Sequence, residues 1–259
     1  MMKTLLTRGM SAGVGAGLLA FAFASVFGES QIGHAISFGN HHLAHAMALV
    51  DPTARVAPAP VSRSVQSTIG LATGTCIYGL AFGGIFALVF AGVYGRVGHA
   101  TPRTTAALLA LAGFFVIILV PVLKYPANPP SIGNPATIAH RTELYFLMIA
   151  ISLIAAIAGV RLYRAMVAPH GAWTAGLLAG MAYIAVIAVA QLMMPAVNEV
   201  PPGFPATVLW RFRIASLGTQ LVLWSTIGIG FGLLAERALR QTATRASRNP
   251  PGTEPSRTA

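Results

Sequence analysis

Four of the seven histidines in the chain lie close together, at His34, His41, His42 and His45. On a helix over residues 31–50, the first, second and fourth of them would fall within about 40° of one another. Neutral imidazole suits Co, Ni, Cu and Zn, and two histidines four residues apart on a helix can hold one ion. The pattern predicts metal capture, and a solvated polar face without a ligand is an equally weighted alternative.

Further polar candidates stand in two proline-containing segments. Glu199 lies in NEVPPGFP at residues 198–205, and Asn128 lies in KYPANPP at residues 124–130, which is followed by His140. Proline stops a helix and fixes an extended path, so these segments hold their side chains in place. Glu199 and His140 are interpreted as further metal ligands and Asn128 as a pathway-lining group. The alternatives are a rigid connector and, for Glu199, an ion pair with the nearby arginines.

Two glutamines, Gln191 and Gln220, fall inside strongly apolar stretches. An amide that faces lipid is costly, so both are candidates for lining a pathway, with interhelical hydrogen bonding as the equal alternative. The apolar stretches lack the acid, base and nucleophile pairs that catalysis requires, which argues against an enzyme. No G-x-x-x-x-G-K-[ST] motif for ATP is present, and no tightly bound cofactor is expected.

The elements that must position these groups are membrane-spanning helices. Apolar residues make up 55% of the chain and charged residues 9%, with a mean hydropathy of +0.70. About 20 apolar residues cross a bilayer as a helix. An all-α, polytopic fold is therefore predicted, with five spans as the alternative to six. The six predicted spans cover residues 9–27, 69–94, 105–123, 144–160, 173–194 and 214–235.

Lysine and arginine are unevenly distributed over alternate connections. Eleven of the 17 lie before the first span, in the second and fourth connections or in the tail, and six lie on the other side. The positive-inside rule places both termini in the cytoplasm and the histidine-containing loop, residues 28–67, outside. The net charge of +11 is thereby interpreted as a topology signal, and no nucleic-acid partner is expected.

The two ends of the chain allow separate interpretations. Lys3 and Arg8 before the first apolar stretch are also compatible with a cleaved secretory signal. Gly9, Gly13 and Gly17 favour a retained span, because glycines four apart let another helix approach closely in lipid. Residues 1–237 are predicted to form a single membrane domain, and residues 238–259 a disordered, basic cytoplasmic tail.

Four segments resemble one known family. VSRSVQ at residues 61–66, KYPANPP at 124–130, NEVPPGFP at 198–205 and LWRFRIASLGTQLVLW at 209–224 are similar to the CbtA family of probable cobalt transporter subunits. The resemblance implies cobalt uptake across a bacterial inner membrane for cobalamin synthesis. It also implies a small, single-span, histidine-rich CbtB-like partner.

The sequence thus supports a membrane subunit of a divalent-metal uptake system, in which the metal ion, with cobalt expected, is the transported substrate. Membrane lipid is its surrounding partner, and a homo-oligomer is possible. The alternative is a non-transporting scaffold that holds a small partner subunit through glycine-rich helices.

Overall fold

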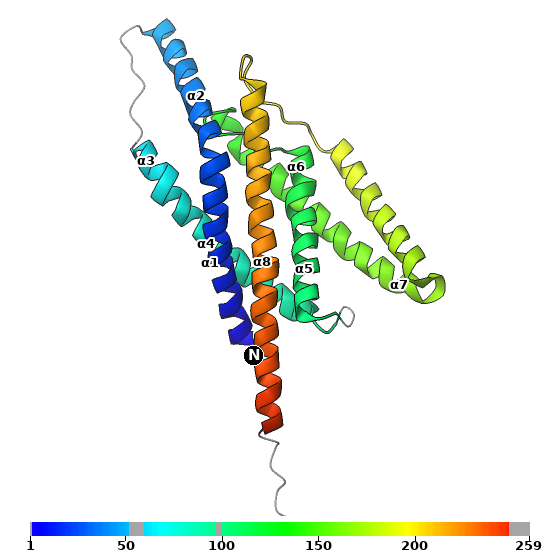
Figure 1. The fold of residues 1–259 in the computed structure, drawn as a ribbon. Helices are drawn as coiled ribbons and strands as arrows, with labels where there is room; N and C mark the ends of the chain where they lie inside the picture. Colours follow the sequence, from blue (N-terminus) through cyan, green and yellow to red (C-terminus); the bar gives the residue numbers. More distant parts are fainter. Residues whose placement is uncertain (1, 52–59, 97–99, 249–259) are drawn as a thin grey trace, which may run out of the picture. The chain divides into compact units, whose positions relative to one another are not determined.

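The computed structural model describes residues 2–51, 60–96 and 100–248, with side chains described to residue 241 (Figure 1). Within these ranges the chain is helical and contains no β-strand, which confirms the all-α prediction. The predicted loop residues 52–59, the connection residues 97–99 and the tail residues 249–259 lie outside the described residues.

Each of the six predicted spans is helical in the structure to within one residue of its predicted end. The segments are α1 (Met2–Phe27), α2 (Glu29–Val50), α3 (Arg63–Val65), η1 (Gln66–Gly70), α4 (Leu71–Val93), α5 (Pro102–Gly113), η2 (Phe114–Leu119), α6 (Val120–Lys124), η3 (Pro135–Thr137), α7 (Ile138–Met193) and α8 (Ala206–Arg248). Five uninterrupted helical stretches of the described chain are long and apolar enough to cross a membrane.

The longest of these stretches contains two crossings. α7 reverses direction at Gly171, whose backbone has φ 75° and ψ 164°, values that fit glycine and no helix (Figure 1). Ser152 on the first leg contacts Tyr183 on the second, with 2.9 Å between their hydroxyl oxygens. The two legs therefore run antiparallel, and five helical stretches supply six crossings.

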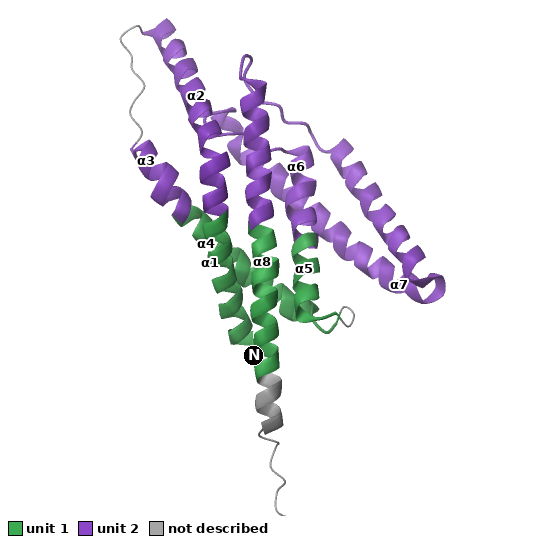
Figure 2. Cartoon of the chain, in the orientation of Figure 1, with its two compact units in different colours: residues 1–19, 73–111, 223–259 green, residues 20–72, 112–222 purple. Residues whose placement is uncertain are grey.

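Contacts along the chain divide it into two compact units, which are described separately (Figure 2). Unit 1 comprises residues 1–19, 73–111 and 223–259, and unit 2 comprises residues 20–72 and 112–222. Exposed apolar side chains occur on the helices of both units, such as Ile85 (57%) in α4 and Ile154 (67%) in α7. Such outward faces are suited to contact with lipid chains.

In unit 1, α1 and α4 pack through the predicted glycines. A Cβ added at Gly13 would overlap the carbonyl oxygen of Gly79, and one at Gly9 would overlap that of Gly83. At Gly17 an added Cβ would come within 2.7 Å of the Cα of Cys76. The backbones are in direct contact, which confirms the close helix approach that the glycine spacing predicts.

Unit 1 also brings the start of α1 beside the end of α8. Arg8 donates hydrogen bonds to the Leu234 carbonyl and to Gln241. Arg103, in the first turn of α5, pairs with Glu236. The first and last helices therefore have their chain ends on the same side of unit 1, as an even number of crossings requires.

In unit 2, a proline distorts the helix formed by η2 and α6. η2 is a π-helical stretch, in which each N–H bonds the carbonyl five residues earlier. Because Pro121 has no N–H, the carbonyl of Val116 receives no such bond. The freed Val116 carbonyl accepts from Ser152 Oγ at 2.8 Å, and the Val120 carbonyl accepts from Gln191 Nε2 at 3.0 Å. These carbonyls therefore accept hydrogen bonds from α7 side chains.

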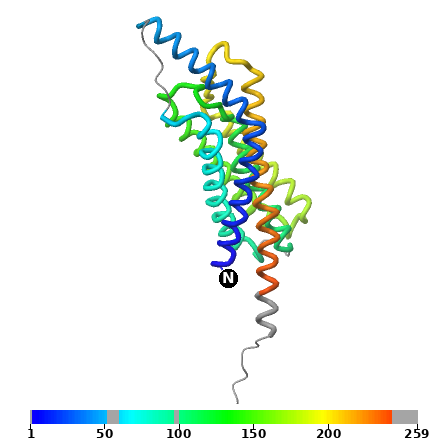
Figure 3. Tube along the Cα trace, turned by 60° about the vertical axis from the view of Figure 1, so that its left-hand side comes forward, coloured from blue at the N-terminus to red at the C-terminus, as the bar shows by residue number. Residues whose placement is uncertain are grey.

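The histidine-containing loop is largely helical. Backbone hydrogen bonds continue through Gly28, from Gly28 N to Ala24 O and from Ile32 N to Gly28 O, so α2 follows on from the last turns of α1 (Figure 3). This confirms the predicted helix over 31–50.

The end of the chain differs from the predicted tail. α8 continues to Arg248, although disorder was predicted from residue 238. Ala238 is 7% exposed, and Glu236 pairs with Arg240 one turn later at 2.7 Å. Ion pairs between residues four apart and the high helix propensity of alanine stabilise α8 beyond the end of its apolar segment.

Candidate functional site

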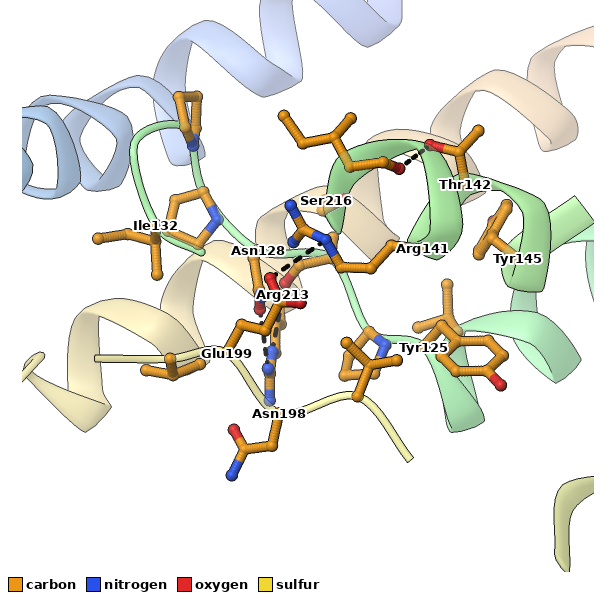
Figure 4. Close-up of a pocket in the computed structure, with 18 of the residues that line it drawn as sticks. Tyr125, Asn128, Ile132, Arg141, Thr142, Tyr145, Asn198, Glu199, Arg213 and Ser216 are labelled. Carbon is orange, nitrogen blue, oxygen red and sulfur yellow. Dashed lines mark hydrogen bonds and ion pairs between the residues drawn. The ribbon is translucent and has the colours of Figure 1, made fainter. Parts of the chain in front are cut away.

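A cavity of about 490 Å³ lies within unit 2, lined by both proline-containing connections (Figure 4). The remaining lining comes from η2, from α6, from α8 and from the first turns of α7. Three of the four family-like segments therefore meet at one place. The lining residues are Ile118, Val122, Tyr125, Pro126, Ala127, Asn128, Pro129, Pro130, Ser131, Ile132, Ile138, Arg141, Thr142, Tyr145, Val197, Asn198, Glu199, Val200, Arg213, Ser216, Leu217 and Gln220.

The connection from α6 to α7 is held against the cavity by an arginine of α8. Arg213 Nε donates to the Ala127 carbonyl at 3.2 Å, and its Nη2 donates to Asn128 Oδ1 at 3.1 Å. Pro129 is fully buried beside this pair. The planar guanidinium bonds two acceptors at once, so it fixes the position of the connection on α8.

Glu199 joins the second proline-containing connection to the first. Its Oε1 accepts from the Thr137 hydroxyl at 2.5 Å, and its Oε2 accepts from the Asn134 N–H at 2.9 Å. Arg141 Nε lies 3.3 Å from Oε2, and Figure 4 shows the two side chains pointing toward each other. Glu199 is thus the centre of a clamp between the two connections.

A glycine makes room for this clamp. Gly133 has φ 116°, and a Cβ there would lie 2.8 Å from Arg141 Nη1 and 3.3 Å from Glu199 Oε2. Any other residue would be strained in this backbone conformation and would crowd the ion pair. Gly133 is therefore required by both its conformation and the space around it.

The environment of Glu199 favours its ionised form. Its pKa lies below the ordinary value of 4.5, chiefly because the Thr137 hydroxyl donates to the carboxylate, and also because of the Asn134 N–H and the Arg141 charge. The carboxylate is charged at neutral pH, and its oxygens already have donors. A metal ion would have to displace some of these contacts.

Gln220 lies at the cavity on α8, one turn beyond Ser216. Its Oε1 atom is buried and accepts no hydrogen bond from the described part of the chain. A buried amide oxygen without a donor costs free energy, so this atom is left unsatisfied by the described part of the chain. The pathway-lining prediction for Gln220 is compatible with this position and remains a prediction.

The four predicted histidine ligands are placed on α2, and all four are exposed. His41 and His45 are one helical turn apart, while the His42 ring lies against Phe38 with 4.3 Å between ring centroids. Within the described ranges, no three His, Cys, Asp or Glu side chains gather closely enough to hold one metal ion. The structure does not assemble the predicted ligands into one centre.

The other predicted site residues have separate surroundings. His140 is exposed, and its Nδ1 lies 3.9 Å from Glu143. Gln191 bonds the Val120 carbonyl across helices and does not line the cavity, so its interhelical alternative describes the geometry. Asn128 does line the cavity, where it accepts from Arg213.

From the sequence, the nearby arginines expected to pair with Glu199 are Arg211 and Arg213, whereas its ion-pair partner in the structure is Arg141. Arg141 is 58 residues away along the chain, and no spacing rule connects them. The cavity roles of Arg141 and Arg213 were also missed. The sequence did contain a sign of these roles, because each arginine lies between a proline-containing segment and an apolar span.

The helices and the cavity define a multi-pass helical membrane protein with a ligand-sized cavity, lined in part by polar side chains, in its second unit. The chain belongs to the family described as "Probable cobalt transporter subunit (CbtA)", whose sequence model matches residues 2–236. This confirms the resemblance found in the four segments. No curated protein and no solved structure gives a significant match to the chain.

Family membership makes the chain a probable cobalt transporter subunit, which is not an enzyme class, and makes cobalt its expected cargo. The word subunit implies a partner. Together with the membrane-spanning helices, membership supports a multi-pass membrane protein engaged in metal transport.

Proposed function

We propose that the chain admits cobalt from the outer face of a bacterial inner membrane and supplies it for cobalamin synthesis. The observation that carries the proposal is the cavity of unit 2, where three family-like segments meet around polar side chains. Its walls include the two connections predicted to lie outside. The Gln220 side chain lines this cavity and places a polar group next to apolar helix.

Metal capture is proposed to begin on α2. His41 and His45 are exposed on successive turns, a geometry in which two imidazoles can bind one ion, and His34 stands two turns before His41. His42, His140 and Glu199 are proposed as additional or transient ligands. With two protein ligands and several waters, such a site would bind weakly, which suits capture followed by release.

Radioactive cobalt uptake by cells that depend on this protein tests the histidine step. Replacing His41, His42 and His45 by alanine is expected to lower uptake at limiting cobalt, because the proposed capture site is lost. His170→Ala is the matched control, since His170 lies at the α7 reversal, on the predicted cytoplasmic side. Unchanged uptake in the triple variant would remove the histidine step and leave the family assignment intact.

A non-transporting scaffold is the second candidate, favoured by one observation on α7. Gly176 and Gly180 are exposed, four residues apart, and a Cβ at either would meet nothing within 4 Å. Such a pair can receive a helix of a small single-span partner or of a second copy. Purified chain in liposomes separates the candidates, because a transporter raises cobalt flux when its driving force is supplied and a scaffold leaves the flux at background.

A further inference from the structure

The charged groups around the cavity leave it with positive charge. Three charged side chains line it, namely Arg141, Glu199 and Arg213. Arg141 and Glu199 compensate each other at 3.3 Å. Arg213 bonds a backbone carbonyl and an amide oxygen, both neutral, and no carboxylate of the described chain lies within ion-pair distance of it. The cavity therefore repels a bare divalent cation and attracts an anion.

The volume of the cavity points to something larger than a metal ion. Six waters at about 30 Å³ each occupy roughly 180 Å³, the approximate size of a hydrated ion's first shell. The cavity holds about 490 Å³, within the range of about 300–1,000 Å³ typical of small-molecule sites. Its size fits a small organic molecule with several functional groups.

The polar lining offers donors that suit carboxylate oxygens. Arg213 binds its two neutral acceptors through Nε and Nη2, which leaves Nη1 to donate. Ser216 and Gln220 follow Arg213 on α8 at one-turn intervals and line the same cavity. The Gln220 amide can present its NH₂ group to an anion after rotation about its last side-chain bond, which would also move the unpartnered Oε1.

From the charge, the size and these donors, we infer that the cavity binds a small polycarboxylate anion and that cobalt enters it as a complex with such an anion. This inference rests on the proposed function, because it specifies the form in which the substrate is bound. Arg213 is the residue that contacts a carboxylate of the ligand. The exposed histidines of α2 would then bind cobalt before or during its transfer to the anion.

Equilibrium binding of radiolabelled citrate, with and without equimolar cobalt chloride, tests the inference on the full chain in phosphatidylcholine nanodiscs. Saturable binding is expected in both conditions. Arg213→Gln should weaken it at least tenfold, since it removes a charged donor from a carboxylate. Arg211→Gln is the matched control, because Arg211 is exposed two residues earlier on α8 and does not line the cavity.

Ser216→Asp tests the charge argument without removing the contacts that Arg213 makes to the connection. It should also weaken citrate binding at least tenfold, while the elution volume and thermal unfolding of the protein match the wild type. The inference is overturned if the wild type binds no citrate, or if both variants bind citrate as tightly as the wild type. It is also overturned if phosphatidylglycerol in the nanodiscs abolishes citrate binding, because the anion would then be a lipid headgroup.

Failure of the inference and failure of the proposed function are separable. Citrate binding without any cobalt flux in reconstituted vesicles would contradict transport and leave the anion site. Cobalt flux that is equal in the wild type, Arg213→Gln and Ser216→Asp would leave transport and contradict the anion site.

Discussion

Glu199 shows how a residue predicted to bind metal can also organise the site around it. It accepts two hydrogen bonds and pairs with Arg141, all from the connection between α6 and α7 and the first turns after it. The carboxylate thereby sets the distance between two walls of the cavity. Its charge is needed for that role, which makes the clamp sensitive to pH.

The pH dependence of thermal stability tests this role of Glu199. Because its folded-state pKa lies below 4.5, the ionised carboxylate stabilises the fold above that pH, and the contribution is lost as the pH falls through the lower folded-state pKa. Glu199→Gln should therefore melt at a lower temperature than the wild type at pH 7, and the gap should close in acid. Glu143→Gln, at an exposed carboxylate, is the control, and an equal gap at every pH would contradict the prediction.

At the scale of helices, close packing depends on residues without bulk. Gly9 and Gly13 of α1 meet the backbone of α4, and two glycines of α8 approach α5. A Cβ added at Gly228 would lie 2.5 Å from the Ala110 Cβ, and one added at Gly232 would lie 3.2 Å from the Ala106 Cβ. The glycines of α1 were predicted to pack closely from their spacing, and those of α8 were not. Helices that pack in lipid gain little from hydrophobic burial, so they depend on such close contacts.

Gly13→Ala and Gly15→Ala form a matched pair on α1. The first should destabilise the protein by about 1–3 kcal/mol, since its Cβ would overlap the Gly79 carbonyl. The second should be neutral or stabilising by up to about 1 kcal/mol, since nothing lies within 4 Å and alanine favours the helix. Unfolding in mixed detergent micelles measures both, and equal effects would contradict the glycine contact.

The π-helical stretch of η2 depends on one hydroxyl. Ser152 is fully buried, donates to the Val116 carbonyl and contacts the Tyr183 hydroxyl. Ser152→Ala should cost about 1–3 kcal/mol of unfolding free energy, because it leaves a buried carbonyl without a donor. Tyr183→Phe should cost less, since the bond to Val116 remains. A larger effect for Tyr183→Phe would show that the carbonyl is satisfied in another way.

For the whole molecule, the number of crossings depends on the reversal at Gly171. The end of α8 lies beside the start of α1 in unit 1, through Arg8 and Leu234, so the two legs of α7 must count as two crossings. A single crossing for α7 would give the five-span alternative and would place the chain ends on opposite sides.

Reporter fusions test this count and the predicted orientation. Fusions at Gly171 and after Arg248 should both be active in the cytoplasm, while fusions within 130–134 and at Gly203 should be active outside. Because the reporters read opposite sides, each fusion serves as a control for the others. Outer activity after Arg248 would contradict the orientation, and opposite activities at Gly171 and after Arg248 would contradict six crossings.

The sequence by itself determined the membrane class, the six spans, the glycines through which α1 packs closely and the family. These follow from local composition and spacing, since a bilayer demands long apolar helices and a lipid-embedded seam demands small residues. The four family-like segments were also readable as local patterns. Such features require no knowledge of which distant residues meet.

The tertiary structure decided which polar groups share a site. It paired Glu199 with Arg141, joined Gln191 to the Val120 carbonyl, and left the α2 histidines exposed and outside the cavity lining. Ion pairs and hydrogen bonds between residues far apart in the chain depend on how the helices and connections fold together, which no spacing encodes. For the same reason, the positive charge of the cavity became visible only when its three charged side chains were brought together.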